Sequence, residues 1–223
     1  TMIKFWFAPR WIDYAKERYN IAPKMKGLTD PIFEPLFSGL EDRKLKLLLH
    51  TSDPDIWYEQ KYQPESKYGT KKQHLEDFEI ILQKYPKLKI QGAHLGAQPE
   101  HLDNISRWFE KHPNFIADIS SARWMAREFS KNPKKSRDFL IKYADRLFFG
   151  TDLSYGRKDK ENRRYFYTRY LTYQALLETN VLNLPLPFAD PENQNNTIIN
   201  GLDLPNNILE KLYWQSAQNF FSN

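Results

Sequence analysis

The chain has 223 residues, of which 40% are hydrophobic and 15% aromatic. This composition excludes a disordered or low-complexity protein, and the length favours one large domain over two. Lys and Arg number 33 against 28 Asp and Glu, and this small excess is spread along the chain, so no nucleic-acid partner is indicated. Because cysteine is absent, disulfides, thiolate zinc sites and a cysteine nucleophile are excluded, and a metal site has to use His and carboxylate ligands.

The opening segment TMIKFWFAPR loses its apolar character at Pro9 and Arg10. No run elsewhere approaches the roughly 18 apolar residues that span a bilayer. The sequence therefore predicts neither a membrane helix nor a signal peptide, and it leaves the cellular location open.

Five short apolar runs predict buried strands, and amphipathic stretches between them predict helices. Asp30, Thr70 and Asn132 mark three helix starts. This alternation predicts a parallel sheet, either doubly wound or closed as a barrel, in one α/β domain over residues 1–223. An aromatic-rich helix, a long irregular loop and a closing helix follow. The strands are expected at Ile3–Phe7, Leu45–Leu49, Leu88–Ala93, Phe115–Ile119 and Arg146–Gly150, the loop at Asn183–Asn200 and the closing helix at about Pro205–Phe221.

Polar side chains close four of these strands. His50 ends LLLH, His94 ends IQGAH, Asp118 and Ser120 end FIADIS, and Asp152 ends LFFGTD. Carboxyl ends of parallel strands meet at one edge of the sheet, where function is expected. A histidine after an apolar strand needs a hydrogen-bond partner or a metal ion, so His50, His94 and Asp152 predict metal or acid–base chemistry. For Asp118 and Ser120 a local role is favoured, because an Asp at a strand end often caps the following helix or bonds a neighbouring loop.

The other three histidines, His74, His101 and His112, fall in or beside amphipathic helices and are expected at the surface. Two basic runs stand out. The first, Lys131–Arg137, begins a helix and is expected to be a solvated face, whereas the second, Gly156–Arg164, follows Asp152 and is a weaker candidate for holding an anionic substrate. No G-x-S-x-G, P-loop or G-x-G-x-x-G motif is present, which argues against serine hydrolases, phosphate-loop nucleotidases and simple dinucleotide-binding domains.

The blocks LLLHTSDPDIWY, YPKLKIQGAHLGAQPEHL, HPNFIADISSA, YADRLFFGTDLSY and ILEKLYWQSAQNFF, in this order, resemble the amidohydrolase-related family of metal-dependent TIM-barrel enzymes. This family includes aminocarboxymuconate-semialdehyde decarboxylase. The resemblance implies that IKFW is barrel strand four, that His50 closes strand five as a metal ligand, that His94 closes strand six, and that Asp152 closes strand eight as a ligand. The cofactor implied is a divalent ion, most simply zinc.

The chain departs from this family at one point. Members carry an H-x-H pair after strand one, and the sequence contains no H-x-H. Strands one to three have no counterpart, so the expectation is a partial barrel of strands four to eight, the carboxyl-terminal two thirds of the domain, which cannot close by itself. The alternatives are an open sheet with repurposed strand ends and a barrel completed by another chain. An unpaired edge on the first strand predicts a homo-oligomer or a borrowed partner.

The sequence therefore predicts a metal-dependent hydrolase that cleaves a C–N or C–O bond of a small molecule, with no membrane or nucleic-acid partner. His94 and Asp152 are the expected catalytic residues, and His50 and Asp152 the expected metal ligands. A metal-dependent decarboxylase of the same fold is the near alternative, and a non-catalytic small-molecule or carbohydrate-binding α/β protein is the alternative from another class. Residues beside the strand ends are expected to contact substrate: Trp6, Arg10, Trp57 and Tyr155.

Overall fold

The computed structural model describes residues 1–20, 27–154 and 163–222. These residues form two compact units, Thr1–Ala117 and Asp118–Asn223. The main sheet has the strand order β1-β2-β3-β4-β5, and the pairs from β1 to β4 are parallel. Each strand lies within two residues of its predicted position, so the predicted α/β class with a parallel sheet is confirmed. The strands are β1 (Met2–Trp6), β2 (Lys46–His50), β3 (Ile90–Gly92), β4 (Phe115–Asp118) and β5 (Leu147–Phe148).

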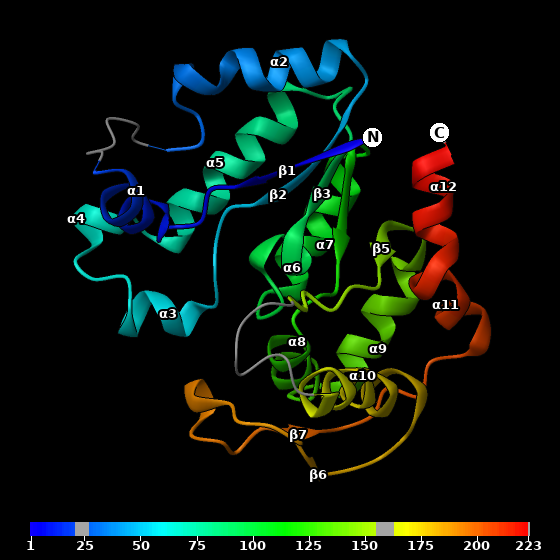
Figure 1. Cartoon of the computed structure of the whole chain (residues 1–223). Helices are drawn as coiled ribbons and strands as arrows, with labels where there is room; N and C mark the ends of the chain where they lie inside the picture. The colour runs from blue at the N-terminus through cyan, green and yellow to red at the C-terminus, as the bar shows by residue number, and fades with distance from the viewer. Residues whose placement is uncertain (21–26, 155–162, 223) are drawn as a thin grey trace. The chain divides into compact units, whose positions relative to one another are not determined.

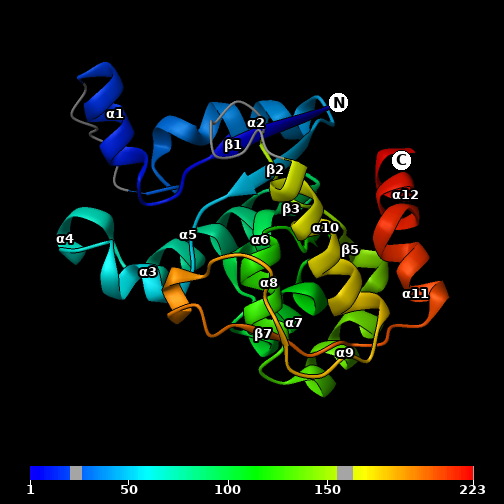
Figure 2. The ribbon, with the colours of Figure 1, turned by 60° about the horizontal axis from the view of Figure 1, so that its bottom comes forward.

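The core of the first unit contains three aromatic rings from two helices and β4. Phe78 and Trp108 pack edge to face on Phe115 with ring centroids 5.7 and 5.6 Å away. Figures 1 and 2 place α1, α3 and α4 near the carboxyl ends of β1 and β2. The helices of this unit are α1 (Trp11–Tyr19), η1 (Pro31–Phe33), α2 (Glu34–Asp42), α3 (Asp55–Gln60), α4 (Glu65–Tyr68), α5 (Lys71–Lys84), α6 (Ala93–Ala97) and α7 (Leu102–Lys111).

The three helix starts predicted from the sequence are confirmed by their hydrogen bonds. Asp30 accepts from the Ile32 amide at 3.1 Å, and Asn132 accepts from the Lys135 amide at 3.1 Å. Thr70 forms a complete capping box with Gln73, because each side chain accepts from the backbone N–H of the other residue. Local side-chain chemistry therefore fixes where these helices begin.

Loss of the Thr70 cap should destabilise the protein by about 1 kcal/mol, since an amide of α5 loses its hydrogen-bond acceptor. Thr70→Ala is expected to lower the free energy of unfolding, measured by urea denaturation, by this amount. Thr70→Ser keeps the hydroxyl and is expected to stay close to wild type. Equal destabilisation by both variants would show that the cap does not account for the effect.

The second unit contains α8, α9 and α10, and the segment that the sequence predicts to be irregular follows α10. That segment includes a short antiparallel pair, β6 and β7. Each strand is only two residues long, which explains why no alternating pattern reveals it. The remaining elements are α8 (Ala122–Phe129), α9 (Pro133–Lys142), η2 (Ala144–Arg146), α10 (Arg163–Glu178), β6 (Leu184–Pro185), η4 (Pro191–Asn193), β7 (Ile198–Ile199), α11 (Asn206–Glu210), the π-helical turn η5 (Lys211–Gln215) and α12 (Ser216–Ser222).

A buried ion cluster ties this segment to α8. The Arg127 guanidinium donates to both carboxylate oxygens of Asp190, at 2.9 and 3.2 Å, and to Glu128 at 3.0 Å. Thr197 donates its hydroxyl to Asp190 at 2.6 Å. Asp190 is fully buried and Arg127 is 8% exposed, so the cluster is largely shielded from water.

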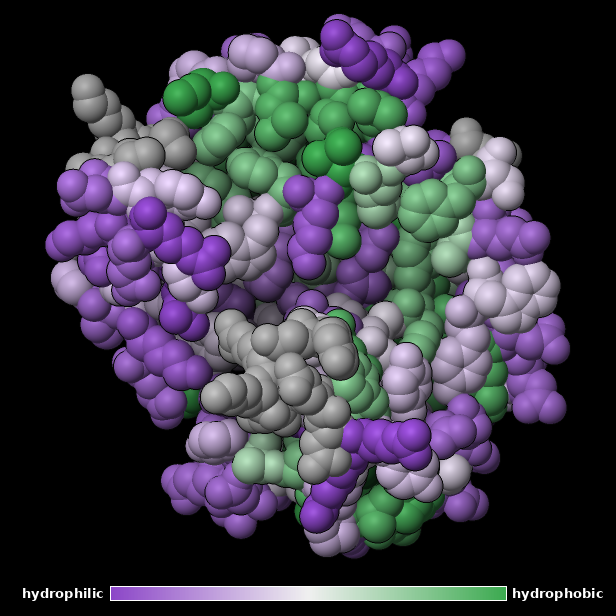
Figure 3. Space-filling model, in the orientation of Figure 1, coloured by the Kyte–Doolittle hydropathy of each residue, from purple (hydrophilic) through white to green (hydrophobic). Residues whose placement is uncertain are grey.

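β1 is the outermost strand of the main sheet, and part of its apolar surface is exposed. Ile3 of β1 and Ile32 of η1 are 39% and 62% exposed, and Figure 3 shows a hydrophobic area over β1 and α2. Within the described residues, no helix has the length and apolar character needed to cross a membrane. The prediction of a homo-oligomer stays a prediction.

Candidate functional site

His50 is the last residue of β2, and the strand register places Trp6 of β1 directly beside it. The Phe7 amide donates to the His50 carbonyl at 2.8 Å, which fixes the two strand ends together. The Trp6 and His50 rings meet edge to face with centroids 6.1 Å apart. Of the residues expected to contact substrate, Trp6 is therefore placed next to a predicted site histidine.

His94 follows β3 on an unusual turn. His94, Leu95, Gly96 and Ala97 all have positive φ, between 53° and 63°. A left-handed conformation costs non-glycine residues roughly 1–2 kcal/mol each, and such strain is concentrated at functional sites. Gly92 has no room for a side chain, because a Cβ there would lie 2.8 Å from the Phe115 ring and 2.9 Å from the Gly96 Cα. The close approach of this turn to β4 therefore requires glycine at position 92.

The His50 and His94 rings pack edge to face with centroids 4.9 Å apart. His94 is 5% exposed, and the His50 side chain is 12% exposed. His50 and His94, two of the three strand-end residues expected to converge, are therefore in contact in the first unit, and the place of Asp152 beside them stays a prediction. Imidazoles are side chains that can give and take protons near neutral pH, so this contact at the carboxyl edge of the sheet is a candidate for acid–base chemistry.

A buried carboxylate completes this group. Asp53 Oδ1 lies 3.3 Å from His50 Nε2, and Asp53 Oδ2 accepts a hydrogen bond of 2.5 Å from the Tyr62 hydroxyl. Burial raises the pKa of Asp53, but the hydrogen bonds from His50 and Tyr62 and the charges of His50 and His94 bring this pKa below its usual value. Asp53 is therefore an ionised acceptor beside the histidine pair.

Two buried polar atoms near these strand ends have no hydrogen-bond partner in the described part of the chain. They are Thr51 Oγ1, directly after His50, and Gln98 Nε2, directly after the left-handed turn. An unsatisfied buried polar atom costs about 1–3 kcal/mol. Such costs are typical of functional regions, where local stability is given up for a required geometry.

The remaining predicted site residues have different positions. Arg10 is exposed and lies over the Tyr14 ring at 5.3 Å, and Trp57 is half-buried under the Lys61 ammonium at 3.7 Å. Asp152 is exposed in the second unit with a φ of 52°, and its role stays a prediction. Tyr155 lies outside the described residues, as does most of the basic run at 156–164.

Asp118 and Ser120 form a local turn at the end of β4. Asp118 Oδ1 accepts from the Ser120 amide at 3.1 Å and from the Ser120 hydroxyl. Both side chains are buried. These contacts match the capping alternative considered for Asp118.

A metal ion needs three or four protein ligands in a complete site. Within residues 1–20, 27–154 and 163–222, no three His, Asp or Glu side chains are placed to hold one. The Nε2 atom of His50 faces the Asp53 carboxylate. The described residues therefore do not fit a metal centre by themselves.

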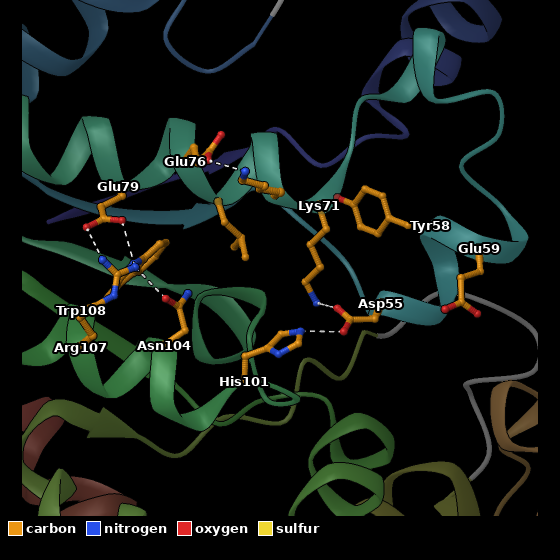
Figure 4. Close-up of a pocket in the computed structure, with 12 residues that line it drawn as sticks. Asp55, Tyr58, Glu59, Lys71, Glu76, Glu79, His101, Asn104, Arg107 and Trp108 are labelled. Carbon is orange, nitrogen blue, oxygen red and sulfur yellow. Dashed lines mark hydrogen bonds and ion pairs between the residues drawn. The ribbon is translucent and has the colours of Figure 1, made fainter.

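A pocket of about 570 Å³ lies apart from the histidine pair, between α3, α5 and the start of α7. Figure 4 shows Lys71 and His101 pointing to Asp55 from two elements. At the other end, Glu79 faces Arg107 at 3.4 Å. The charged side chains that line this pocket mostly neutralise one another.

Two of the three histidines expected at the surface lie elsewhere. His101 is exposed and pairs with Asp55 at 2.7 Å, as expected. His74 is half-buried, with Nε2 at 2.7 Å from the Tyr68 carbonyl. His112 is 4% exposed, so its surface prediction is wrong. The helix ends at His112 and turns inward to β4, while its Nε2 lies 3.4 Å from Glu79.

The ionised Glu79 carboxylate is expected to contribute its full stabilisation above about pH 4.5, the ordinary pKa of a glutamate. Burial raises the pKa of Glu79, but hydrogen bonds from Lys111 and His112 and the charge of Arg107 lower it below that value. This stabilisation is then lost as the pH falls from about 4.5 to the lowered pKa that Glu79 has in the folded protein. Urea unfolding measures the acid loss, which is the decrease in the free energy of unfolding between pH 7 and pH 4. In Glu79→Gln this acid loss should be smaller than in wild type by about 0.2–1 kcal/mol. The expected difference is small because Arg107 and Lys111 are half exposed.

Glu76→Gln is the matched control, because its ion pair with Lys72 is exposed on the same helix. This variant is expected to leave the acid loss unchanged. An acid loss that is the same in Glu79→Gln as in wild type would contradict the assigned pKa direction.

Asp53 and Tyr62 are the two site residues that the strand-end pattern does not reveal. Asp53 lies three residues beyond β2, in the polar run TSD, and only the structure shows that it is buried. Tyr62 reaches Asp53 only because the chain turns back after α3. Sequence periodicity carries no information about such a turn.

A protein-family model described as amidohydrolase matches residues 17–222. Comparison with curated proteins gives no match. Among solved structures, the chain resembles a protein described as a 2-pyrone-4,6-dicarboxylic acid hydrolase from Pseudomonas putida, with a TM-score of 0.54 and 13% identity over 99% of this chain and 62% of that chain.

The chain also resembles a dihydroorotase from Campylobacter jejuni, with a TM-score of 0.50 and 12% identity over 100% of this chain and 64% of that chain. A 2,6-dihydroxybenzoate decarboxylase gives a TM-score of 0.46 and 13% identity, over 96% and 66% of the two chains. The chain spans about half to two thirds of the length of such structures. The likeness confirms the expected α/β fold of the partial-barrel type.

Proposed function

This chain belongs to the amidohydrolase family, and we propose that it carries catalytic residues of a hydrolase that cleaves a C–N or C–O bond of a small molecule. The observation that supports the proposal is the contact between His50 and His94, with ring centroids 4.9 Å apart at adjacent strand ends. Hydrolysis of such a bond needs a base for the attacking water and an acid for the leaving group. One imidazole of this pair can serve both needs in turn, while the other holds it in place.

His94 is the proposed acid–base residue. As water attacks the carbonyl carbon, the His94 imidazole takes one proton from that water. The C–N or C–O bond then breaks, and the same proton passes to the departing nitrogen or oxygen. The left-handed turn fixes His94 beside His50, so little reorganisation is needed during the reaction.

Members of this family generally use a divalent metal ion. We propose zinc for this protein, with His50 and Asp152 among its ligands and Asp152 as a second acid–base group. Because the described residues do not form a complete ligand group, such an ion would need further ligands from outside them. Arg10, Trp6, Trp57 and Tyr155 stay proposed substrate contacts.

The test is a panel of lactones, cyclic amides and aromatic carboxylates incubated with the protein, with and without added Zn²⁺. Opening of a lactone or amide ring, detected by mass spectrometry, is the expected result. Release of CO₂ without any ring opening would contradict hydrolysis and identify a decarboxylase. Binding without any chemical change would favour the non-catalytic alternative.

A further inference from the structure

We propose that Asp53 and Tyr62 are positioning residues that fix the tautomer and orientation of His50. The inference deepens the proposed function and rests on it for its chemical purpose. The three side chains form one line of contacts. Tyr62 donates to Asp53 Oδ2 at 2.5 Å, and Asp53 Oδ1 lies 3.3 Å from His50 Nε2.

The line of contacts has only one consistent direction. An ionised carboxylate accepts hydrogen bonds and cannot donate them. A phenol hydroxyl that donates to one oxygen leaves the other oxygen to accept from His50, so the proton of the neutral ring lies on Nε2. His50 Nδ1 then carries the lone pair and is the atom that can bind a metal ion or a proton. The hydrogen bond made by one ring nitrogen sets the role of the other.

Burial makes these contacts stable. Asp53 is 8% exposed and Tyr62 is 1% exposed. The Tyr62 ring packs against three neighbouring aromatic rings, with centroids 6.1 Å from Trp57, 5.1 Å from Tyr58 and 5.4 Å from Tyr68. The hydroxyl of Tyr62 is therefore held in place by its ring, and water does not compete for Asp53.

Replacing Asp53 by asparagine should reverse the tautomer of His50. The Tyr62 hydroxyl still needs an acceptor, which the amide oxygen provides. The amide NH₂ group then faces His50 Nε2, and it can only donate. The favoured ring has its proton on Nδ1, the opposite of wild type. A residue that merely supports the fold would produce no such reversal.

The experiment records nitrogen–proton correlations of the histidine rings in ¹⁵N-labelled protein. A pH of about 9 keeps the rings neutral, since the ordinary histidine pKa is about 6.5. The five histidines are assigned with single His→Gln variants. Wild-type His50 is expected to give Nε2 protonated and Nδ1 unprotonated, and Asp53→Asn is expected to exchange the two signals.

Tyr58→Phe is the matched control. The Tyr58 hydroxyl bonds to Ser52 at 2.6 Å and its ring packs on Tyr62, so this variant removes a neighbouring hydroxyl of the same kind whose described hydrogen bond is to Ser52 and not to Asp53. Tyr58→Phe alone should leave the two ring-nitrogen signals of His50 as they are in wild type. Tyr58→Phe combined with Asp53→Asn should show the same exchange of these signals as Asp53→Asn alone. Tyr62→Phe in the same background should abolish the exchange, because the amide can then turn its oxygen to His50.

Two results would overturn the proposal. One is a wild-type His50 with its proton on Nδ1. The other is an Asp53→Asn protein whose His50 keeps the wild-type tautomer while its circular dichroism spectrum shows a folded chain. The wild-type measurement stands even where a variant fails to fold. The tautomer of His50 is measured without any substrate, so the result does not depend on whether the protein turns over a compound of the substrate panel. A failure of the proposed hydrolase function can therefore be distinguished from a failure of this inference.

Discussion

Replacement of His94 by alanine is expected to lower turnover by roughly 10²–10⁴-fold, the usual contribution of a positioned acid–base group. Water and leaving group lose their proton carrier, while β3 and its neighbours keep their packing. The measurement is kcat on the compound that the panel identifies. His101→Ala is the matched control, because His101 is exposed in the outer pocket and pairs only with Asp55 among the contacts described.

Metal analysis of the same variants separates acid–base from ligand roles. We expect His50→Ala and Asp152→Ala to lower the metal content of the purified protein, because each removes a proposed ligand. His94→Ala should retain its metal. A loss from His94→Ala as large as that from His50→Ala would make His94 a ligand, and full activity of His94→Ala would refute its catalytic role.

Asp190→Ala is expected to destabilise the protein by about 3–5 kcal/mol. Arg127 is only 8% exposed and would keep its charge after losing its main partner, which is the usual cause of such large effects. Since a folded domain is stable by about 5–15 kcal/mol, this loss should lower the melting temperature strongly. Calorimetry and urea denaturation measure it.

Asp138→Ala is the control for the loss of an ion pair as such. Its contact with Lys134 is 2.6 Å long, but the two side chains are 57% and 87% exposed, so a change below about 0.5 kcal/mol is expected. Arg127→Met combined with Asp190→Leu should recover part of the lost stability, because the unpaired Arg127 charge is removed while Glu128 keeps its ion pair with Lys131 at 2.5 Å. An Asp190→Ala protein within 1 kcal/mol of wild type would show that the cluster is not essential.

Local and periodic signals account for the parts of the fold that the sequence predicts. The apolar run before His50 predicts β2, and Thr70, a residue type that caps helices, predicts the start of α5. The rule that parallel strands end at one edge explains why His50 and His94 meet. Each of these features depends on residues close together in the sequence, or on a general property of parallel sheets.

The parts that escaped prediction depend on long-range packing. Asp53 becomes a site residue because Tyr62, nine positions later, returns to it. The left-handed turn at His94 depends on how closely Gly92 and Gly96 approach Phe115. His112 is buried because Glu79 from α5 is there to meet it. None of these contacts follows from residue type or spacing alone.

The most direct test of the central claim is to locate where the reaction product binds. Proton–carbon correlations of the five histidine rings are recorded as the product of the identified reaction is added. Binding at the strand ends predicts shifts of the His50 and His94 signals, with His101 and His112 unchanged. Shifts confined to His101, in the pocket between α3, α5 and α7, would contradict the assignment of the active site to the histidine pair.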